Sequence, residues 1–415
     1  MAILWYDGFE LDRTRDALEQ SYSLVLNFPT SRPATTGRFF GSSLRNIPSS
    51  GPSELGTFTL PWTYPSFLRR SYMGIAIRTN SPGSQEILRM VGSTGVSANW
   101  SVQTVESGSG EFAIRLLDID SATVFTSTNY LYDTWIYLEL FVYCQNNGSW
   151  IMRINGSEVG SGTADFYQAP PEKFVIRWGV LPTSAEYIEY DDMYLSEDTG
   201  FFGDLFAVEA SLPVADSPYI AWEDPGVGVV HYSLVNESGE SDGDSTYVET
   251  NTLGIGDAYY FSPPTNIQAG IISVRVNIDA RNPGIDDGQA VAAFIQSVSS
   301  PTPIYGAETT LLGSYSRGRS EWVLNPMTNA AWTILDFGNT GIGVVKLSGS
   351  SGEAILPIKD ENQVSGSIAV SYSSEMIPLY DENGVLGQLA THNLNTNLKI
   401  LDESQLEGDF PLTVI

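Results

Sequence analysis

Alternation of apolar and polar positions is the dominant pattern of this chain, and it is clearest between residues 135 and 159. Residues 136–143 read IYLELFVY, so one face of an extended strand would be aliphatic and the other largely aromatic. The polar break QNNG at 145–148 separates this run from a second, WIMRI, at 150–154. Asn-Gly readily takes the positive φ of a tight hairpin turn. The pattern predicts a two-stranded antiparallel ribbon, which needs a surrounding sheet to be stable in water.

Shorter runs of the same kind recur through the first half of the chain, each bounded by Gly, Ser, Asn or Pro. They lie at 22–28, 72–78, 86–91, 100–105, 112–117, 123–126, 173–178 and 186–195. Roughly ten short strands at near-regular spacing predict a two-sheet sandwich or jelly roll over residues 1–199.

The pattern changes after a linker-like junction at 199–204. Further strands are predicted at 205–210, 258–261, 270–278, 290–298, 309–315 and 342–347. Trp322 and Trp332 flank a turn that contains Pro326, and we expect both rings to pack near it. We interpret residues 200–350 as a second β-sandwich domain.

Residues 351–415 are acidic and show few strand patterns, only at 365–372 and 398–401, before an apolar end at 410–415. We interpret them as a small C-terminal docking region. The apolar end docks either on its own domain or as an added strand on a neighbouring subunit.

Four features, in order, carry a resemblance to a known family. They are DGFE at 7–10, Thr134-Trp135 before the alternating run, the hairpin from Gly148 to Gly156, and YDDMYL at 190–195. Together they resemble the concanavalin A-like, laminin-G-like jelly roll found in structural proteins of tailed bacteriophages. The segment from Trp322 to Thr333 resembles part of the module that follows this domain in many phage virion proteins.

The resemblance implies an all-β fold: a concanavalin A-like jelly-roll sandwich over residues 1–199, a second β-sandwich over 200–350 and a small region over 351–415. It implies a structural virion protein, displayed on the surface as a capsid decoration or as a subunit of the tail or its fibres. Other virion proteins of the capsid, neck or tail would be its partners, and copies would associate symmetrically. The alternative is an adhesin that binds a host surface polysaccharide, and a third candidate is a polysaccharide-degrading enzyme.

Charge and cysteine content narrow the setting. The chain has 49 Asp and Glu against 20 Lys and Arg, for a net charge of −29, so we expect neither nucleic acid nor an anionic membrane as partner. Cys144 is the one cysteine, so no intrachain disulfide can form, and its place inside a strand predicts a buried hydrophobe. The N-terminus lacks the pattern of a secretory signal and no run approaches a membrane span. We therefore expect synthesis in a host cytoplasm and assembly into a virion.

Candidate ligand sites follow from aromatic and acidic side chains. Lectin-like sandwiches bind glycans on aromatic faces beside Asn and Asp. Trp62, Tyr64, Trp100, Tyr130 and Tyr132 are the candidates for such faces, although each is equally suited to a core or an interface.

Calcium is the one metal that the composition favours, because it takes clustered carboxylate and carbonyl oxygens. Asp242, Asp244, Asp286 and Asp287 lie in glycine-containing loops and are the candidate ligands, with a merely polar turn as the alternative. No cofactor is otherwise expected, because phosphate-binding and dinucleotide fingerprints are absent from the sequence.

Catalysis is not expected. Glycosidases of the jelly-roll class place two carboxylates on one strand face, and the nearest match is EYDDMY at 189–194. Glu189 and Asp191 share a face by period-two geometry, but Tyr194 stands where an acid/base Glu is needed. We interpret this stretch as a solvent-facing strand.

Histidine chemistry is not indicated either. His231 and His392 are the only histidines, and neither lies near a Gly-x-Ser-x-Gly motif. We expect ordinary loop or edge residues, and two histidines with one cysteine do not make a zinc site.

Overall fold

A computed structural model describes this chain in segments. They are residues 2–7, 38, 43–45, 57–59, 70–92, 98–167, 169, 171–176, 186–197, 200–224, 230–236, 245–264, 270–283, 289–297 and 300–347, followed by six strands between 354 and 411. The fold described here is that of these residues.

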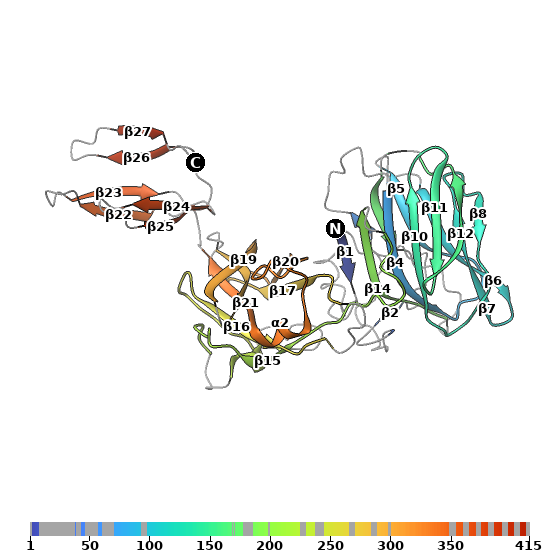
Figure 1. The fold of residues 1–415 in the computed structure, drawn as a ribbon, viewed down its shortest axis with the longest axis horizontal. Helices are drawn as coiled ribbons and strands as arrows, with labels where there is room; N and C mark the ends of the chain where they lie inside the picture. Colours follow the sequence, from blue (N-terminus) through green and yellow to red (C-terminus); the bar gives the residue numbers. More distant parts are fainter. Residues whose placement is uncertain are drawn as a thin grey trace.

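The first half of the chain forms two facing antiparallel sheets, which we call the N-terminal sandwich (Figure 1). The first sheet has the order β1 (Ala2–Asp7), β14 (Ile188–Glu197), β4 (Arg70–Thr79), β10 (Ile136–Tyr143), β11 (Gly148–Ile154) and β12 (Ser157–Ala164), and β2 (Leu44–Arg45) also pairs with β14. The second sheet has the order β3 (Thr57–Thr59), β13 (Pro171–Ile176), β5 (Gln85–Gly92), β6 (Ala98–Gly108), β7 (Glu111–Leu117) and β8 (Thr123–Thr126), and β9 (Tyr130–Leu131) also pairs with β7. The chain crosses between the sheets after β2, β3, β4, β9, β12 and β13. The predicted jelly-roll sandwich is confirmed.

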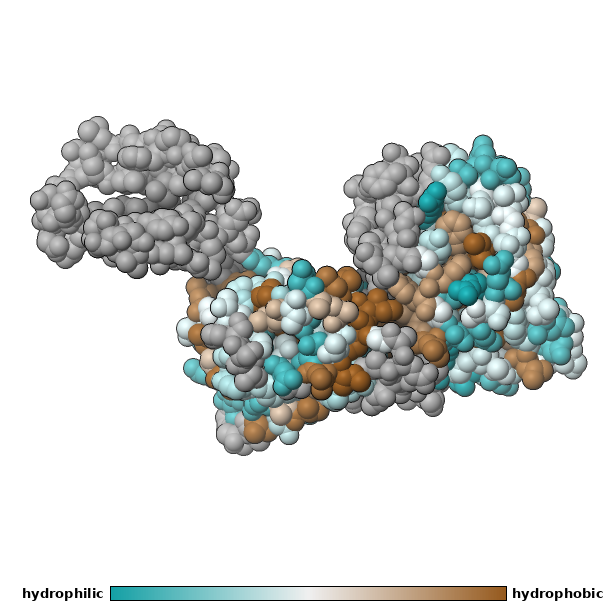
Figure 2. Space-filling view, viewed as in Figure 1, coloured by the Kyte–Doolittle hydropathy of each residue, from teal (hydrophilic) through white to brown (hydrophobic). Residues whose placement is uncertain are grey.

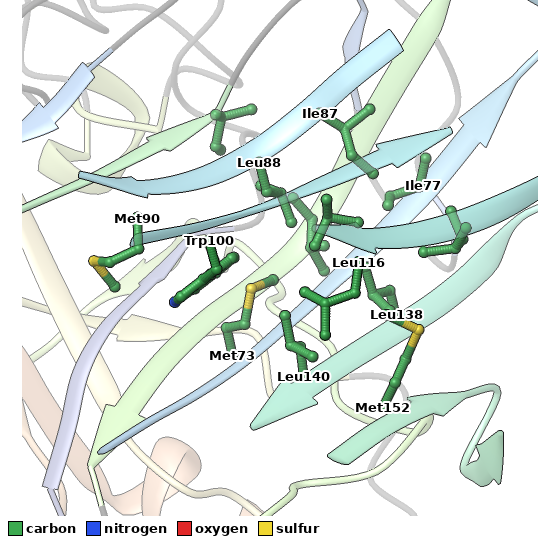
Figure 3. Packing of buried hydrophobic residues seen from close by; sticks show 14 of the residues in the cluster. Met73, Ile77, Ile87, Leu88, Met90, Trp100, Leu116, Leu138, Leu140 and Met152 are labelled. Atoms are coloured by element: carbon green, nitrogen blue, oxygen red, sulfur yellow. The ribbon is translucent and has the colours of Figure 1, made fainter. Parts of the chain in front are cut away.

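The core lies between these two sheets and is built from alternate residues of each strand. On β10 the inward residues are Ile136, Leu138, Leu140 and Val142, as the sequence pattern predicted. Figure 3 shows aliphatic and methionine side chains from both sheets closing around the fully buried ring of Trp100. Cys144 belongs to this core, and burial raises the pKa of its thiol to about 12, so it is the buried hydrophobe that was predicted.

The central hairpin sets the register of the first sheet. β10 and β11 pair with Leu138 opposite Ile154 and Val142 opposite Trp150, across a turn in which Asn147 has a φ of 54°. A second turn, Asn155-Gly156, has φ values of 49° and 76° and leads into β12. Its Asn155 Oδ1 accepts a hydrogen bond from the Tyr137 backbone N–H at 2.8 Å, which ties the turn to the start of β10.

Residues 213–347 form two further layers, which we call the central layers. A five-stranded sheet has the order β15 (Pro213–Asp216), β16 (Gly256–Phe261), β21 (Thr340–Leu347), β18 (Ala290–Ser297) and β19 (Ser300–Thr310). It faces a two-stranded ribbon of β17 (Val274–Ala280) and β20 (Ser316–Trp322). The predicted second sandwich is thus present as five strands against two.

The tryptophan-rich turn closes one end of these layers. Trp332 is buried and donates its indole N–H to the Trp322 carbonyl at 2.9 Å, and Trp322 packs against the same core cluster. The buried Asn325 accepts the Met327 N–H at 2.9 Å and forms a bridge with Ala330. Both tryptophans pack beside the turn, as predicted.

Several local predictions are wrong. Residues 205–210 form no strand, the strand predicted at 309–315 ends at Thr310, and β12, β15 and β20 were missed. The short helix α2 (Ile334–Asn339) was also missed, although Thr333 and Asp336 form a reciprocal capping box at its start. The C-terminal region is rich in strands rather than poor. They are β22 (Ala354–Lys359), β23 (Ser365–Val370), β24 (Glu375–Tyr380), β25 (Leu386–Thr391), β26 (Asn397–Leu401) and β27 (Glu407–Pro411).

Helices contribute little to the described residues. Besides α2 there is a 3₁₀ turn, η1 (His231–Leu234), and no helix in this part of the chain has the length and apolar character needed to cross a membrane.

Replacing a leucine by alanine should lower the stability of the protein much more at a buried position than at an exposed one. Leu138→Ala removes a fully buried side chain between the two sheets and should lower the free energy of unfolding by about 2–5 kcal/mol. Leu131→Ala is the control, because Leu131 is 63% exposed, and it should change the value by less than about 0.5 kcal/mol. Urea denaturation measures both, and equal effects would contradict the described packing.

Candidate functional site

The outer face of the first sheet, opposite the core, gathers polar and aromatic side chains that the core does not use. Alternation on β4 and β10 places Ala76, Tyr137 and Glu139 on this face. Tyr194 on β14 lies beside them, and its ring fills the space over Gly74. A Cβ on Gly74 would lie 2.2 Å from Cε1 of Tyr194, so only glycine allows this close approach.

This face is covered by the chain itself. Residues 201–208, which we call the strap, run over it, although the sequence predicted a linker and a strand here. Glu139 is fully buried, and its Oε1 accepts the Gly203 N–H and the Tyr194 hydroxyl, both at 2.7 Å. The Tyr194 hydroxyl in turn accepts the Phe202 N–H at 3.3 Å. The strap is therefore held by its backbone to a buried carboxylate.

Aromatic rings fill the space between strap and sheet. The Tyr194 ring lies 4.6 Å from Phe202 and 4.9 Å from Phe206, both in edge-on geometry, and the two phenylalanines stack at 5.6 Å. Such pairs contribute about 0.5–1.5 kcal/mol each beyond their buried area. Ile272, which precedes β17 of the central layers, packs against the same cluster. Figure 2 shows hydrophobic surface gathered where the central layers meet the N-terminal sandwich.

Arg38 joins the strap to β14 from a third part of the chain. Its backbone N–H donates to Asp191 at 2.6 Å, and its guanidinium lies 4.4 Å from the centre of the Tyr137 ring. The guanidinium also donates to the strap carbonyls of Asp204 and Phe206. One arginine thus contacts sheet and strap together.

Asp192 occupies a β-bulge of β14, where its φ is 47°. Its Oδ1 accepts the Val208 N–H at 2.9 Å, while its Oδ2 is buried without a hydrogen bond and lies 3.9 Å from Arg38 Nη1. Burial outweighs the arginine and raises the pKa of Asp192 to about 6. This carboxyl therefore titrates close to neutral pH at the strap's C-terminal end.

A second cluster lies on the same face, where β4 ends and where β10 and β14 begin. Glu189 is fully buried there, and it pairs with Arg45 through Oε1 and with Arg78 through Oε2. The Arg78 guanidinium lies 5.0 Å from the Trp135 ring centre, and that of Arg45 lies 4.3 Å from Tyr187. We call Arg45, Arg78, Trp135, Tyr187, Glu189 and Asp133, which accepts a hydrogen bond from the Tyr187 hydroxyl, the Glu189 cluster.

These positions correct the interpretation of residues 189–194 as a solvent-facing strand. Glu189, Asp191 and Asp192 are all buried, because two arginines and the strap cover this face. Neither Glu189 nor Asp191 is open to a bulky substrate in this arrangement.

The candidate glycan residues are scattered rather than gathered. Trp100 lies in the core, 6.1 Å from the Phe174 ring, and presents no face to solvent. Tyr130 and Tyr132 are half-buried and pack against Phe112 at the edge of the core. Trp62 and Tyr64 lie outside the described residues.

The candidate calcium ligands Asp242, Asp244, Asp286 and Asp287 also lie outside the described residues. In the part of the chain that the structure describes, three or more metal-binding side chains never converge. Asp118 forms an Asx turn, in which its Oδ1 accepts hydrogen bonds from the N–H groups of Asp120 and Ala122.

His231 is more constrained than an ordinary loop histidine. Its Nδ1 lies 2.6 Å from Oδ2 of Asp257, which is fully buried on β16. Asp257 also accepts the Ala221 and Trp222 N–H groups at 2.7 Å and the Tyr259 hydroxyl at 3.2 Å. The carboxylate thus ties a loop and η1 to the sheet. His392 lies outside the described residues.

Sequence reasoning missed Glu139, Arg38, Arg45 and Arg78 as parts of a site. One signal was available for Glu139: it stands between Tyr137 and Phe141 on the same strand face, and an aromatic outer face indicates a cover. The arginines carried no comparable local signal.

Comparison with known proteins yields structures only. No known protein family and no curated protein matches the sequence. A native heptameric SAP-like pentraxin from Limulus polyphemus is 11% identical over 36% of this chain and 74% of its own, with a TM-score of 0.27. An alginate lyase, Aly36B, is 10% identical over 37% and 81%, with a TM-score of 0.28. The receptor binding domain of botulinum neurotoxin D is 11% identical over 87% and 86%, with a TM-score of 0.31. At these values none of them bears on what this chain binds or catalyses.

Filling the space over Gly74 should loosen the strap. Gly74→Ala pushes a methyl group into the buried Tyr194 ring and the Tyr137 hydroxyl, and should cost about 1–3 kcal/mol of stability. Gly313→Ala is the control, because no atom lies within 4 Å of its added Cβ. Limited proteolysis should cut Gly74→Ala faster between residues 200 and 210, and unchanged cutting would contradict the strap's attachment over Gly74.

Asp192 should make stability depend on pH. Because its folded pKa, about 6, lies above the unfolded value of 3.8, its contribution to stability is present below pH 4 and is lost as pH rises through 6. The loss is of the order of 3 kcal/mol, from about 1.36 kcal/mol per pKa unit. Asp192→Asn, which suits the positive φ and keeps an acceptor for Val208, should remove this dependence.

The measurement is the Tm of both proteins between pH 4 and 7.5. The Tm of Asp192→Asn should rise relative to that of the unmodified protein as pH increases. If the Tm of Asp192→Asn instead falls relative to that of the unmodified protein as pH increases, the attraction of Arg38, which lowers the pKa of Asp192, outweighs the effect of burial.

Proposed function

We propose that this chain is a structural protein of a tailed-phage virion, displayed on the surface and attached to other virion proteins of the capsid, neck or tail. The observation that carries the proposal is the strap. In a sandwich built to bind a ligand on its open sheet, that face is left accessible, whereas here about half a dozen residues of the same chain cover it. The face serves to brace the N-terminal sandwich against the central layers.

Two further features support an assembly role over catalysis. Glu189 and Asp191, the carboxylates of the first sheet that resemble a glycosidase pair, are both buried, and Glu189 is paired with two arginines. The net charge of −29 keeps such a surface soluble at the high local concentration of a symmetric particle. The resemblance of residues 7–10, 134–156, 190–195 and 322–333 to virion modules gives the setting.

The alternative function is a host-surface adhesin that binds a glycan. The Glu189 cluster favours it, because both of its arginines are partly exposed and rest on aromatic rings. Partly exposed arginines beside aromatic rings are suited to an anionic sugar.

Gold-labelled antibodies against residues 1–199, applied to intact particles of the phage that encodes the chain, test the proposal by electron microscopy. Regular label around heads would support capsid decoration, and label on tails or fibres would support a tail-associated subunit. Particles without label, from a lysate in which the protein is detected, would refute surface display.

A further inference from the structure

The Glu189 cluster has hydrogen-bond donors left over. Arg45 donates to Glu189 through Nε. Arg78 also donates through Nε, at 2.5 Å, and its Nη2 lies 2.5 Å from the same carboxylate oxygen as an ion pair. Among the described residues, the two Nη groups of Arg45 and Nη1 of Arg78 donate to no acceptor. Their side chains are 28% and 22% exposed, so these donors are accessible from solvent.

Both guanidinium groups are held in place before any ligand arrives. Each is bonded to a carboxylate that is 0% exposed and rests against an aromatic ring, that of Tyr187 for Arg45 and those of Trp135 and Tyr187 for Arg78. A side chain fixed in this way loses little rotamer entropy on binding, which is the usual cost of recruiting an exposed arginine. The arrangement is that of a preorganised anion site.

An acceptor stands beside the donors. Asp133 is exposed and has a φ of 61°. Its backbone N–H donates to the Thr79 carbonyl at 2.9 Å, and its carboxylate accepts a hydrogen bond from the Tyr187 hydroxyl. A carboxylate has about four lone-pair positions, so one hydroxyl leaves room for further donors. The Tyr187 ring lies 4.3 Å from the Arg45 guanidinium and 5.9 Å from that of Arg78, and the hydroxyl of the same tyrosine is bonded to Asp133, so donors and acceptor lie around one side chain and within reach of one small ligand.

Charge limits which ligand can bind. Glu189 and Asp133 together balance the charge of the two guanidinium groups, so the cluster carries no excess positive charge to attract a polyanion, in a chain whose net charge is −29. A strongly anionic polymer such as an acidic peptide would be repelled by Asp133 and by the negative surface, and its carboxylates could donate no hydrogen bond to Asp133. A sugar residue that carries one carboxylate and several hydroxyls satisfies both sides.

We propose that Arg45 and Arg78 bind the carboxylate of an acidic sugar residue, while a neighbouring hydroxyl of the same sugar donates to Asp133. The protein would thereby recognise carboxylated surface glycans. This inference rests on the glycan-binding alternative, and its failure leaves the virion proposal standing, because the electron-microscopy test reads location and not binding.

Isothermal titration at about 50 mM salt tests it on the full chain. The probes are trimers of galacturonate, glucuronate and N-acetylneuraminate, with an uncharged galactose trimer and a pentaglutamate peptide for comparison. At least one acidic trimer should bind at least tenfold more tightly than the uncharged trimer and the peptide, and binding should weaken with salt.

The variant is Arg45→Gln, which leaves Arg78 on Glu189 so that the buried carboxylate stays paired. Arg70→Gln is the matched control: Arg70 lies at the other end of β4, and its guanidinium also rests on a tyrosine ring, that of Tyr143, at 5.1 Å. We expect Arg45→Gln to weaken binding at least tenfold and Arg70→Gln less than twofold. Asp133→Asn, whose Tm reports folding, should weaken binding about threefold or more.

Three results would overturn the proposal. They are an absence of binding to all three acidic trimers, equal weakening by Arg45→Gln and Arg70→Gln, and tighter binding of pentaglutamate than of any sugar.

Discussion

The structure depends on a buried carboxylate in the middle of a sheet. Glu139 is fully buried and, as an acceptor, needs donors that the first sheet supplies only in part, through the Tyr194 hydroxyl. The backbone N–H of Gly203 supplies a second donor to Oε1, which is present only when the strap lies over the sheet, while Oε2 is buried without a hydrogen bond. An unpaired acceptor in such a place costs several kcal/mol, which makes the covered face the stable one. The position of the central layers follows from the end of this strap.

Period-two alternation explains why most strands of the sandwich could be predicted. Where one face meets the core, as on β4 and β10, the sequence must alternate, and the predicted boundaries of these two strands agree with the structure within two residues. β12 escaped because SEVGSGTA has no apolar alternation, and its pairing is set by the Asn155-Gly156 turn instead. Residues 205–210 alternate for another reason. Phe206 and Val208 pack on the outer face of the first sheet, but these residues do not pair with any strand.

The site itself could not be read from the sequence, because its members come together only in three dimensions. Arg38 lies 153 positions from Asp191, and Arg45 lies 144 from Glu189. A charged residue at an outward position of a strand normally indicates solvent, and nothing local distinguishes Glu139 or Glu189 from that case except their aromatic neighbours. An aromatic residue suits either a binding face or the core, and the sequence does not distinguish the two. Trp100 was a candidate for a glycan-binding face, yet its ring is buried in the core.

The strap also determines how the molecule transmits force. A tension applied to the central layers reaches the N-terminal sandwich through residues 201–208, which are attached at Gly203 and Val208 at their two ends and by rings between. Several hydrogen bonds and ring contacts must therefore break before the strap can leave the sheet, whereas a free linker has none to break. A tether of this kind holds the orientation of the sandwich under drag, where a flexible connection would let it swing.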